Sequence, residues 1–69
     1  MSLRKIKNHI ARKVKALRLE KGISQEKLAE YTNLSREHIS CIERAKNLAT
    51  IETLYNLSQF FEINIKDFF

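Results

Sequence analysis

The stretch Ile23–Arg44 reads ISQEKLAEYTNLSREHISCIER and decides the fold of this chain. It contains two short helical patterns, and each one opens with a serine, Ser24 or Ser35, that can cap its first turn. The break between them, Thr32-Asn33-Leu34, is too short for two helices to pack as an antiparallel hairpin. The two helices are therefore expected to cross steeply, which is the geometry of a helix-turn-helix over residues 24–44.

The second of these helices, Arg36 to about Arg44, carries two different faces. At about 100° per residue, Ile39 and Ile42 point to one side and form its buried face. The opposite arc holds no large apolar residue and consists of Arg36, Glu37, Ser40, Cys41 and Arg44. Because the second helix of a helix-turn-helix can enter the DNA major groove with such an arc, the sequence predicts sequence-specific DNA binding.

The charge of the chain is unevenly distributed. Its 69 residues carry a net charge of +5, yet residues 1–21 hold eight Lys or Arg and one acid, whereas the remainder holds five Lys or Arg and seven acids. A basic segment on a small domain favours a polyanionic partner through phosphate contacts and counterion release. On charge alone, a solvated helix face kept basic for solubility is an equal alternative.

Composition narrows the remaining function classes. The length predicts one domain over residues 1–69, and no catalytic set, paired carboxylates or phosphate loop is present, so neither an enzyme nor a cofactor is expected. Cys41 is the only cysteine, and His9 and His38 are far apart in sequence, which argues against a disulfide or a metal site. No apolar run approaches the ~20 residues that cross a bilayer. We expect a cytoplasmic, nucleoid-associated protein; membrane-surface binding by the basic first helix is a weaker alternative.

The rest of the chain is also helical in pattern. A first helix from about Leu3 to Lys21 has an apolar stripe of Leu3, Ile6, Ile10, Val14 and Leu17, and Gly22 ends it. A fourth helix follows the cap Thr50, with a predicted core stripe of Ile51, Leu54, Leu57, Ser58 and Phe61. Residues 66–69 predict a short fifth helix or single turn. The fold class expected is all-α, a bundle of four to five short helices.

The C-terminal third holds more large apolar residues than one small core needs. The surplus residues are Tyr55, Phe60, Ile65, Phe68 and Phe69. Such a surplus is typical of an interface. We therefore predict a twofold homodimer through residues 51–69, with the two recognition helices about one DNA turn, ~34 Å, apart on an inverted-repeat site.

The ordered combination of motif residues resembles a known family. The chain is similar to the phage repressor and Cro-like helix-turn-helix proteins, also called the xenobiotic-response-element family, over roughly residues 10–69. The proline-free loop before the fourth helix, and that helix itself, are similar to controller proteins of restriction–modification systems. The residues that carry the resemblance are Arg18, Gly22, Gln25, Leu28-Ala29, Ser35, Ile39 and Ile42-Glu43.

The resemblance implies a lambda repressor-like fold and a role for each matching position. Gln25 matches a phosphate-contacting glutamine, and Arg18 and Glu43 match an internal ion pair. The positions that face base edges are Arg36, Glu37, Ser40 and Cys41, and those that grip backbone phosphate are Arg44, Lys46 and Asn47. This chain departs from the family pattern at Ala45, where glycine is common, and at Ala49, where proline is common.

The function expected from the sequence is therefore a homodimeric transcriptional regulator, a repressor or controller that binds an inverted-repeat operator. The partners expected are double-stranded DNA and a second copy of the chain, with RNA polymerase as a further candidate. An antitoxin that binds both its operator and a toxin through the apolar C-terminal surface is the alternative.

Overall fold

Each α-helix begins at a hydroxyl side chain that caps it. The computed structural model describes residues 2–69, so Met1, which the predicted domain includes, lies outside the described residues. The helices are α1 (Leu3–Glu20), α2 (Gln25–Thr32), α3 (Arg36–Glu43) and α4 (Ile51–Phe61), followed by the 3₁₀ turn η1 (Ile65–Phe68). Their cap oxygens accept hydrogen bonds from the third backbone N–H of each helix and belong to Ser2, Ser24, Ser35 and Thr50.

Each α-helix also ends in the same way, with one residue in the left-handed region. The φ angles of these residues are 67° at Gly22, 60° at Asn33, 57° at Ala45 and 56° at Glu62. After each of them, the next backbone N–H bonds a carbonyl five residues back, as Lys46 does to Cys41 at 2.9 Å. This Schellman pattern satisfies carbonyls that a helix end leaves open. Glycine, which adopts this conformation without strain, fills only one of the four positions.

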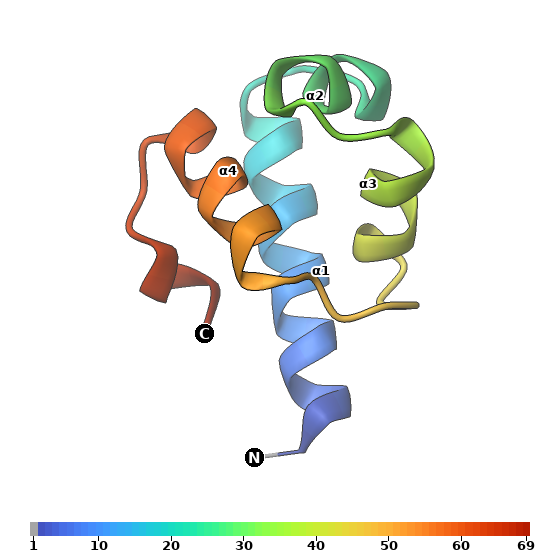
Figure 1. The fold of residues 1–69 in the computed structure, drawn as a ribbon, viewed down its shortest axis with the longest axis vertical. Coiled ribbons are helices and arrows are strands. Elements are labelled where there is room, and N and C mark those ends of the chain that lie inside the picture. The colour runs from blue at the N-terminus through green and yellow to red at the C-terminus, as the bar shows by residue number, and fades with distance from the viewer. Residues whose placement is uncertain (1) are drawn as a thin grey trace.

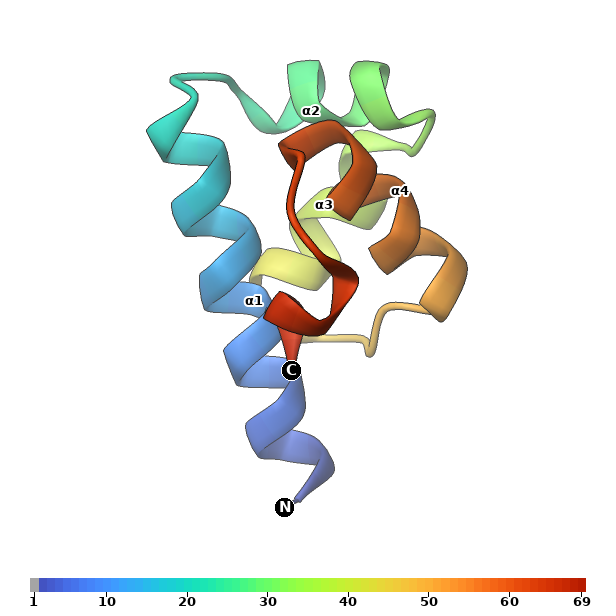
Figure 2. The same ribbon diagram turned by 90° about the vertical axis from the view of Figure 1, so that its left-hand side faces the viewer.

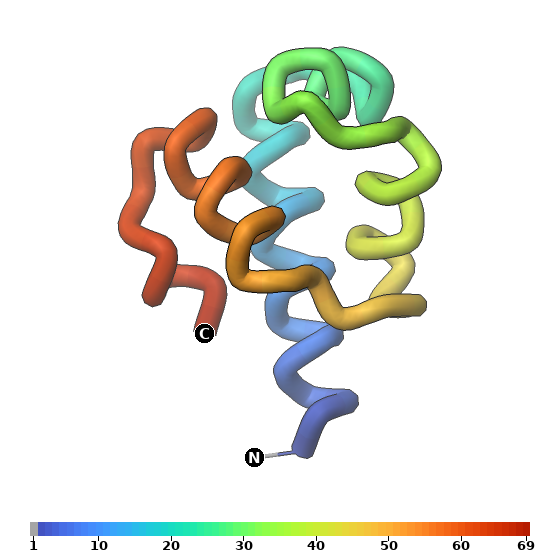
Figure 3. Tube along the Cα trace, viewed as in Figure 1, coloured from blue at the N-terminus to red at the C-terminus, as the bar shows by residue number. Residues whose placement is uncertain are grey.

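The long helix α1 runs along the longest axis of the molecule, and the other elements pack around its C-terminal part (Figure 1). The extents are 31 × 23 × 21 Å. α2 lies across one end, α3 packs against α1, and η1 contacts both α1 and α4 (Figure 2). The trace in Figure 3 shows the N-terminal turns of α1 continuing past the loop between α3 and α4.

The core is formed by the inward faces of all five elements. Its residues are Ile10, Val14, Leu28, Ala29, Ile39, Ile42, Ala49, Leu54, Leu57, Phe61 and Phe68. Two polar side chains buried at its edge are satisfied by backbone carbonyls: Thr32 donates to Leu28 at 2.7 Å and Ser58 donates to Tyr55 at 2.7 Å. The buried residues of α2 are Leu28, Ala29 and Thr32.

Two predicted core positions are wrong. Leu3 is 57% exposed and Ile51 is 67% exposed. Both residues begin a helix. The first turns of α1 extend past the rest of the body and have no neighbour to cover them (Figure 1), whereas in α4 only the side chain of Ile51 points into solvent. In α4 the buried residue of the first turn is Thr53, whose backbone N–H is bonded by the Thr50 cap. The all-α class and the helix count are confirmed, and among residues 2–69 no helix has the length and apolarity needed to cross a bilayer.

Candidate nucleic-acid interface

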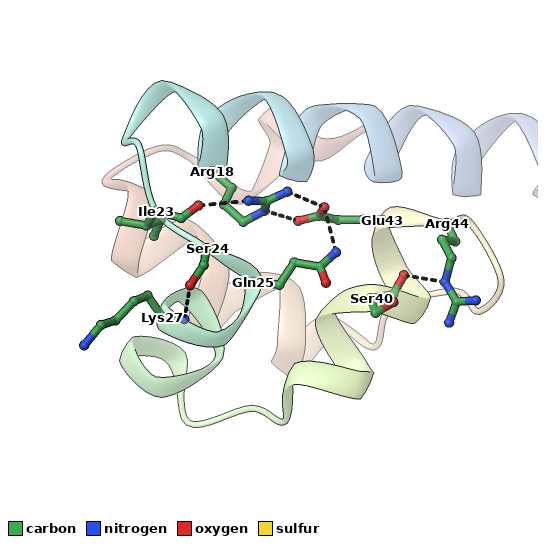
Figure 4. Close-up of polar contacts among 8 residues, drawn as sticks. All are labelled: Arg18, Ile23, Ser24, Gln25, Lys27, Ser40, Glu43 and Arg44. Atoms are coloured by element: carbon green, nitrogen blue, oxygen red, sulfur yellow. Dashed lines mark hydrogen bonds and ion pairs between the residues drawn. The ribbon is translucent and has the colours of Figure 1, made fainter.

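An ion pair fixes the second and third helices against the first. Arg18 on α1 donates from Nε to Glu43 Oε2 at 2.7 Å and from Nη2 to Glu43 Oε1 at 3.1 Å. Its third nitrogen, Nη1, donates to the Ile23 carbonyl at 2.8 Å, and Gln25 Nε2 donates to Glu43 Oε1 at 3.2 Å (Figure 4). One nearly buried carboxylate therefore holds α1, the start of α2 and the end of α3 in register.

The pairing with Glu43 shifts the pKa of Arg18. Hydrogen bonding to Glu43 raises the pKa of Arg18, burial lowers it, and the charge of Glu43 raises it further, so the net direction is upward. The Glu43 side chain is 3% exposed, and it would be costly to bury without these donors. Gln25 donates one N–H of its amide to Glu43. Its amide oxygen and its second N–H take no part in that bond and are available to a ligand.

The polar arc of α3 faces outward, as its sequence pattern predicts. Arg36, Glu37 and Arg44 are exposed, and Ser40 and Cys41 are half-buried, whereas Ile39 and Ile42 are in the core. The arc is therefore open to solvent and presents three ionic groups and one hydroxyl without a large apolar side chain. This is the shape and chemistry with which a helix reads base edges in the major groove.

The Arg44 side chain folds back along α3. Its Nε donates to the Ser40 carbonyl at 3.3 Å, its Nη2 lies 3.8 Å from Cys41 Sγ, and its guanidinium lies 4.0 Å from the Glu37 carboxylate. All of these contacts are exposed, so they hold the side chain weakly. Arg44 can therefore leave Glu37 for a phosphate at little cost.

A shallow hollow joins the starts of α2 and α3. It is lined by Arg18, Ser24, Gln25, Glu26 and Arg36. The sequence predicts a phosphate contact for Gln25 and a base contact for Arg36, but it does not predict that the two residues share one hollow. Free backbone N–H groups and the helix dipole at the start of α2 favour an anion there, and Arg36 adds a cation. Glu26 offsets part of this positive potential. Gln25 and Arg36 come together because α2 and α3 cross steeply. A local sequence pattern does not predict the distance between residues on two crossing helices.

The loop after α3 begins with a residue in the left-handed conformation, which glycine adopts without strain. Ala45 has φ 57°, and its N–H and that of Lys46 close the helix end on Ile42 and Cys41. Alanine therefore adopts the left-handed conformation that the departure from the family pattern brought into question. Lys46 and Asn47 follow it and are exposed, just beyond the C-terminal end of α3.

The predicted dimer residues do not share one environment. Tyr55 and Phe69 are 53% and 56% exposed, which leaves them free for an interface. Phe60 is half-buried, because it stacks on Tyr31 at 5.3 Å between ring centroids and lies beneath the Lys21 ammonium.

Ile65 is also half-buried, and it packs against the core. Phe68 is 0% exposed, so its assignment to the interface is wrong: the 3₁₀ turn points this ring into the core. Leu48, just before the predicted dimerisation region of residues 51–69, is 45% exposed, and Ile51, the first residue of that region and a predicted core residue, is 67% exposed.

Comparison with known proteins places the chain among helix-turn-helix proteins. The helix-turn-helix family model matches residues 14–68. An uncharacterised HTH-type transcriptional regulator of Rickettsia conorii is 31% identical over 67 residues, covering 97% of this chain and 54% of that protein. A second such regulator, from Sinorhizobium fredii, is 40% identical over 43 residues, covering 62% of this chain and 56% of its own length. The chain thus spans about half the length of the curated relatives it matches.

Two solved structures that resemble this fold are those of restriction–modification controller proteins. C.AhdI from Aeromonas hydrophila superposes with a TM-score of 0.85 at 25% identity, over 91% of this chain and 96% of that one. The wild-type controller protein C.Esp1396I superposes with a TM-score of 0.82 at 35% identity, over 99% of this chain and 86% of that one.

Proposed function

The chain belongs to the helix-turn-helix family, and from this premise we propose that it is a sequence-specific DNA-binding transcriptional regulator that acts as a homodimer on an inverted-repeat operator. In this proposal residues 1–69 form one DNA-binding domain, with the helix-turn-helix proper over residues 24–44. The similarity to solved controller proteins favours a controller or repressor of its own promoter within this class.

The observation that carries the proposal is the exposed polar arc of α3 on a braced frame. The arc begins at Arg36 and is held in place through the buried ion pair of Arg18 and Glu43. A reading helix must be rigid, because displaced side chains lose the geometry of a bidentate bond to a base. The ion pair of Arg18 and Glu43 supports α3, the helix for which recognition would require a fixed position.

Each residue of the arc has a proposed role. Arg36 would donate two parallel hydrogen bonds to guanine O6 and N7, and Glu37 would accept from cytosine N4. Ser40 and Cys41 are small enough to let the helix approach the bases closely. Arg44, Lys46 and Asn47 would bind phosphate on one side of the groove, and Gln25 would bind phosphate on the other, at the start of α2.

We assign dimerisation to the exposed face of α4 and the segment before it. Leu48, Ile51 and Tyr55 are all exposed, and the last two are one helical turn apart on α4. Phe69, at 56% exposed, is a further large apolar residue in water, and exposed apolar side chains that gather on one surface are typical of an interface. A twofold axis at this surface would place two copies of α3 about one turn of DNA apart, ~34 Å.

Selection of bound duplexes from a random pool tests the proposal directly. The expected product is an inverted repeat whose half-sites are separated by about one helical turn, ~10 bp. Sedimentation at micromolar concentration should give a dimer. A pool that returns no enriched sequence, with the free protein folded, would overturn the assignment of a sequence-specific regulator. Enrichment of a single unrepeated half-site with a monomeric protein would overturn the dimer alone.

A further inference from the structure

We propose that one flank of α1, formed by Arg4, Lys7 and Lys15 and here called the α1 flank, binds DNA phosphates outside the segment that α3 reads. This inference rests on the proposed function and extends its footprint. It assigns a binding role to basic residues of the N-terminal segment, which lies outside the helix-turn-helix of residues 24–44.

The heptad spacing of α1 places the flank beside α3. Ala11 is 5% exposed, and Arg18 bonds Glu43 on α3, so both belong to the side of α1 that meets α3. Arg4 precedes Ala11 by seven residues, as Ala11 precedes Arg18, and residues seven apart share a helix face to within about 20°. Lys7 and Lys15 lie one turn before and one turn after Ala11. The α1 flank is therefore a stripe along the α3 side of the helix.

The length of α1 takes this stripe beyond α3. A helix of 18 residues is ~27 Å long, whereas α3, with eight, is ~12 Å long. In Figure 4 α1 continues past Arg44 at the end of α3, and in Figure 1 its first turns extend past the rest of the body. With α3 in a major groove ~12 Å wide, a helix that overreaches it on the same side approaches the phosphates that border the groove.

The cations of the flank are not neutralised within the molecule. Among residues 2–69 the ion pairs join Arg18 to Glu43, Lys27 to Glu30 and Arg44 to Glu37, and none uses Arg4, Lys7 or Lys15. The only acid of α1 is Glu20, at the opposite end of the helix. Lys7 is half-buried, so its stem is held against the body while its charge remains unpaired. Unpaired, partly ordered cations bind phosphate with little loss of entropy.

The test compares two charge-matched double variants on the selected operator. Arg4→Gln/Lys7→Gln removes two charges from the flank. Lys5→Gln/Arg12→Gln removes two from the outer side of α1, where Lys5 lies half a turn around the helix from the buried Val14. Glutamine keeps helix propensity, and circular dichroism checks that both variants fold. Binding is measured as a function of salt concentration.

The flank variant should bind on the order of tenfold more weakly at moderate salt, with the slope of log K against log salt reduced by about two. The base preference should not change, because phosphate contacts carry no sequence information. The outer variant should change the slope by less than half as much, and Arg4→Lys/Lys7→Arg should bind like the parent. Equal effects of the two Gln variants, or no effect of the flank variant, would overturn the inference.

The outcomes separate the inference from the proposed function. If the parent protein binds duplex without sequence preference, the regulator assignment fails, while the same two variants still decide whether the flank contacts phosphate. If the parent binds no duplex at all, both are overturned.

Discussion

Arg18 and Glu43 are joined by two hydrogen bonds, of 2.7 and 3.1 Å, that tie the first helix to the end of the third. The pair spans 25 residues of sequence and is supplemented by the Ile23 carbonyl and the Gln25 amide. Because the pKa of Arg18 is raised in the folded state by its hydrogen bond to Glu43, the stability it contributes is fully present below the ordinary arginine range. That stability is lost only as the pH rises through the raised pKa of the folded state, so Arg18 stays charged at every physiological pH.

Replacing Glu43 with Ala should destabilise the domain by about 3 kcal/mol, because it strands a largely buried arginine. Urea unfolding of the variant measures this loss, and DNA binding should fall with the folded fraction. Glu37→Ala is the control: its pair with Arg44 is exposed and 4.0 Å long, so the free energy of unfolding should change by less than about 0.5 kcal/mol. An unchanged melting temperature in Glu43→Ala would contradict the structural role.

Ala45→Gly should stabilise the protein. Ala45 is held at φ 57°, where a Cβ costs ~1 kcal/mol or more and glycine is unstrained. The greater freedom of glycine in the unfolded chain reduces the gain to about 0.5–1 kcal/mol, or a few degrees in melting temperature. The matched control is Ala16→Gly, on the exposed face of α1, which should destabilise by ~1 kcal/mol. Destabilisation by Ala45→Gly as well would mean that the loop does not hold this backbone conformation.

Periodicity and capping residues predict most of this fold because both are local. The caps Ser24, Ser35 and Thr50 each depend on a few neighbouring residues, and all three are found where the sequence places them. Periodicity also gives the correct phase of Ile51 in α4. It cannot indicate whether the first turn of that helix still has a neighbour, and Ile51 is 67% exposed.

The assignment of aromatic residues to core or surface failed for a related reason. Phe68 and Phe69 are adjacent in the sequence and equally apolar, yet one is 0% exposed and the other 56%. A 3₁₀ turn of four residues is too short to show a period, so only its packing on α1 and α4 separates the two rings. The hollow shared by Gln25 and Arg36 likewise depends on the angle between two helices, which is a tertiary quantity.

Phe68→Ala and Phe69→Ala should lower the free energy of unfolding by very different amounts. Removal of the buried ring of Phe68 leaves a cavity and should cost about 3–5 kcal/mol of unfolding free energy. Removal of the exposed ring of Phe69 should cost less than about 1 kcal/mol in a dilute, monomeric sample. Thermal unfolding of both variants measures the difference. Similar losses for the two would show that the C-terminal turn is not oriented as described.

Arg36→Ala should remove preference at one base pair of each half-site. Its side chain is exposed at the start of α3, and a bidentate bond to guanine is worth ~1–3 kcal/mol of discrimination. The measurement is binding across a library of single-base variants of the selected operator. Lys46→Ala provides the contrast, because loss of a phosphate contact should weaken all sites alike. Uniform weakening by Arg36→Ala would reassign this arginine to phosphate, in keeping with the hollow it shares with Gln25.

Ile51→Glu should prevent dimerisation without unfolding the domain. Ile51 is 67% exposed in the first turn of α4, where a carboxylate suits the helix dipole, so the monomer should retain its stability. In a twofold interface the same substitution brings two carboxylates together out of water, and the dimer dissociation constant should rise at least about tenfold, or ~1.4 kcal/mol.

Leu19→Glu is the matched control for this prediction, since Leu19 is 58% exposed on α1, away from the proposed interface. Sedimentation equilibrium of both variants measures the dissociation constant, and titration of full and half operators reports the consequence. Ile51→Glu should lose affinity for the full operator and keep affinity for the half-site, because each recognition helix is intact and only the link between the two copies is broken. A dimer that forms equally well with Glu at residue 51 would place the twofold axis on another surface of the chain.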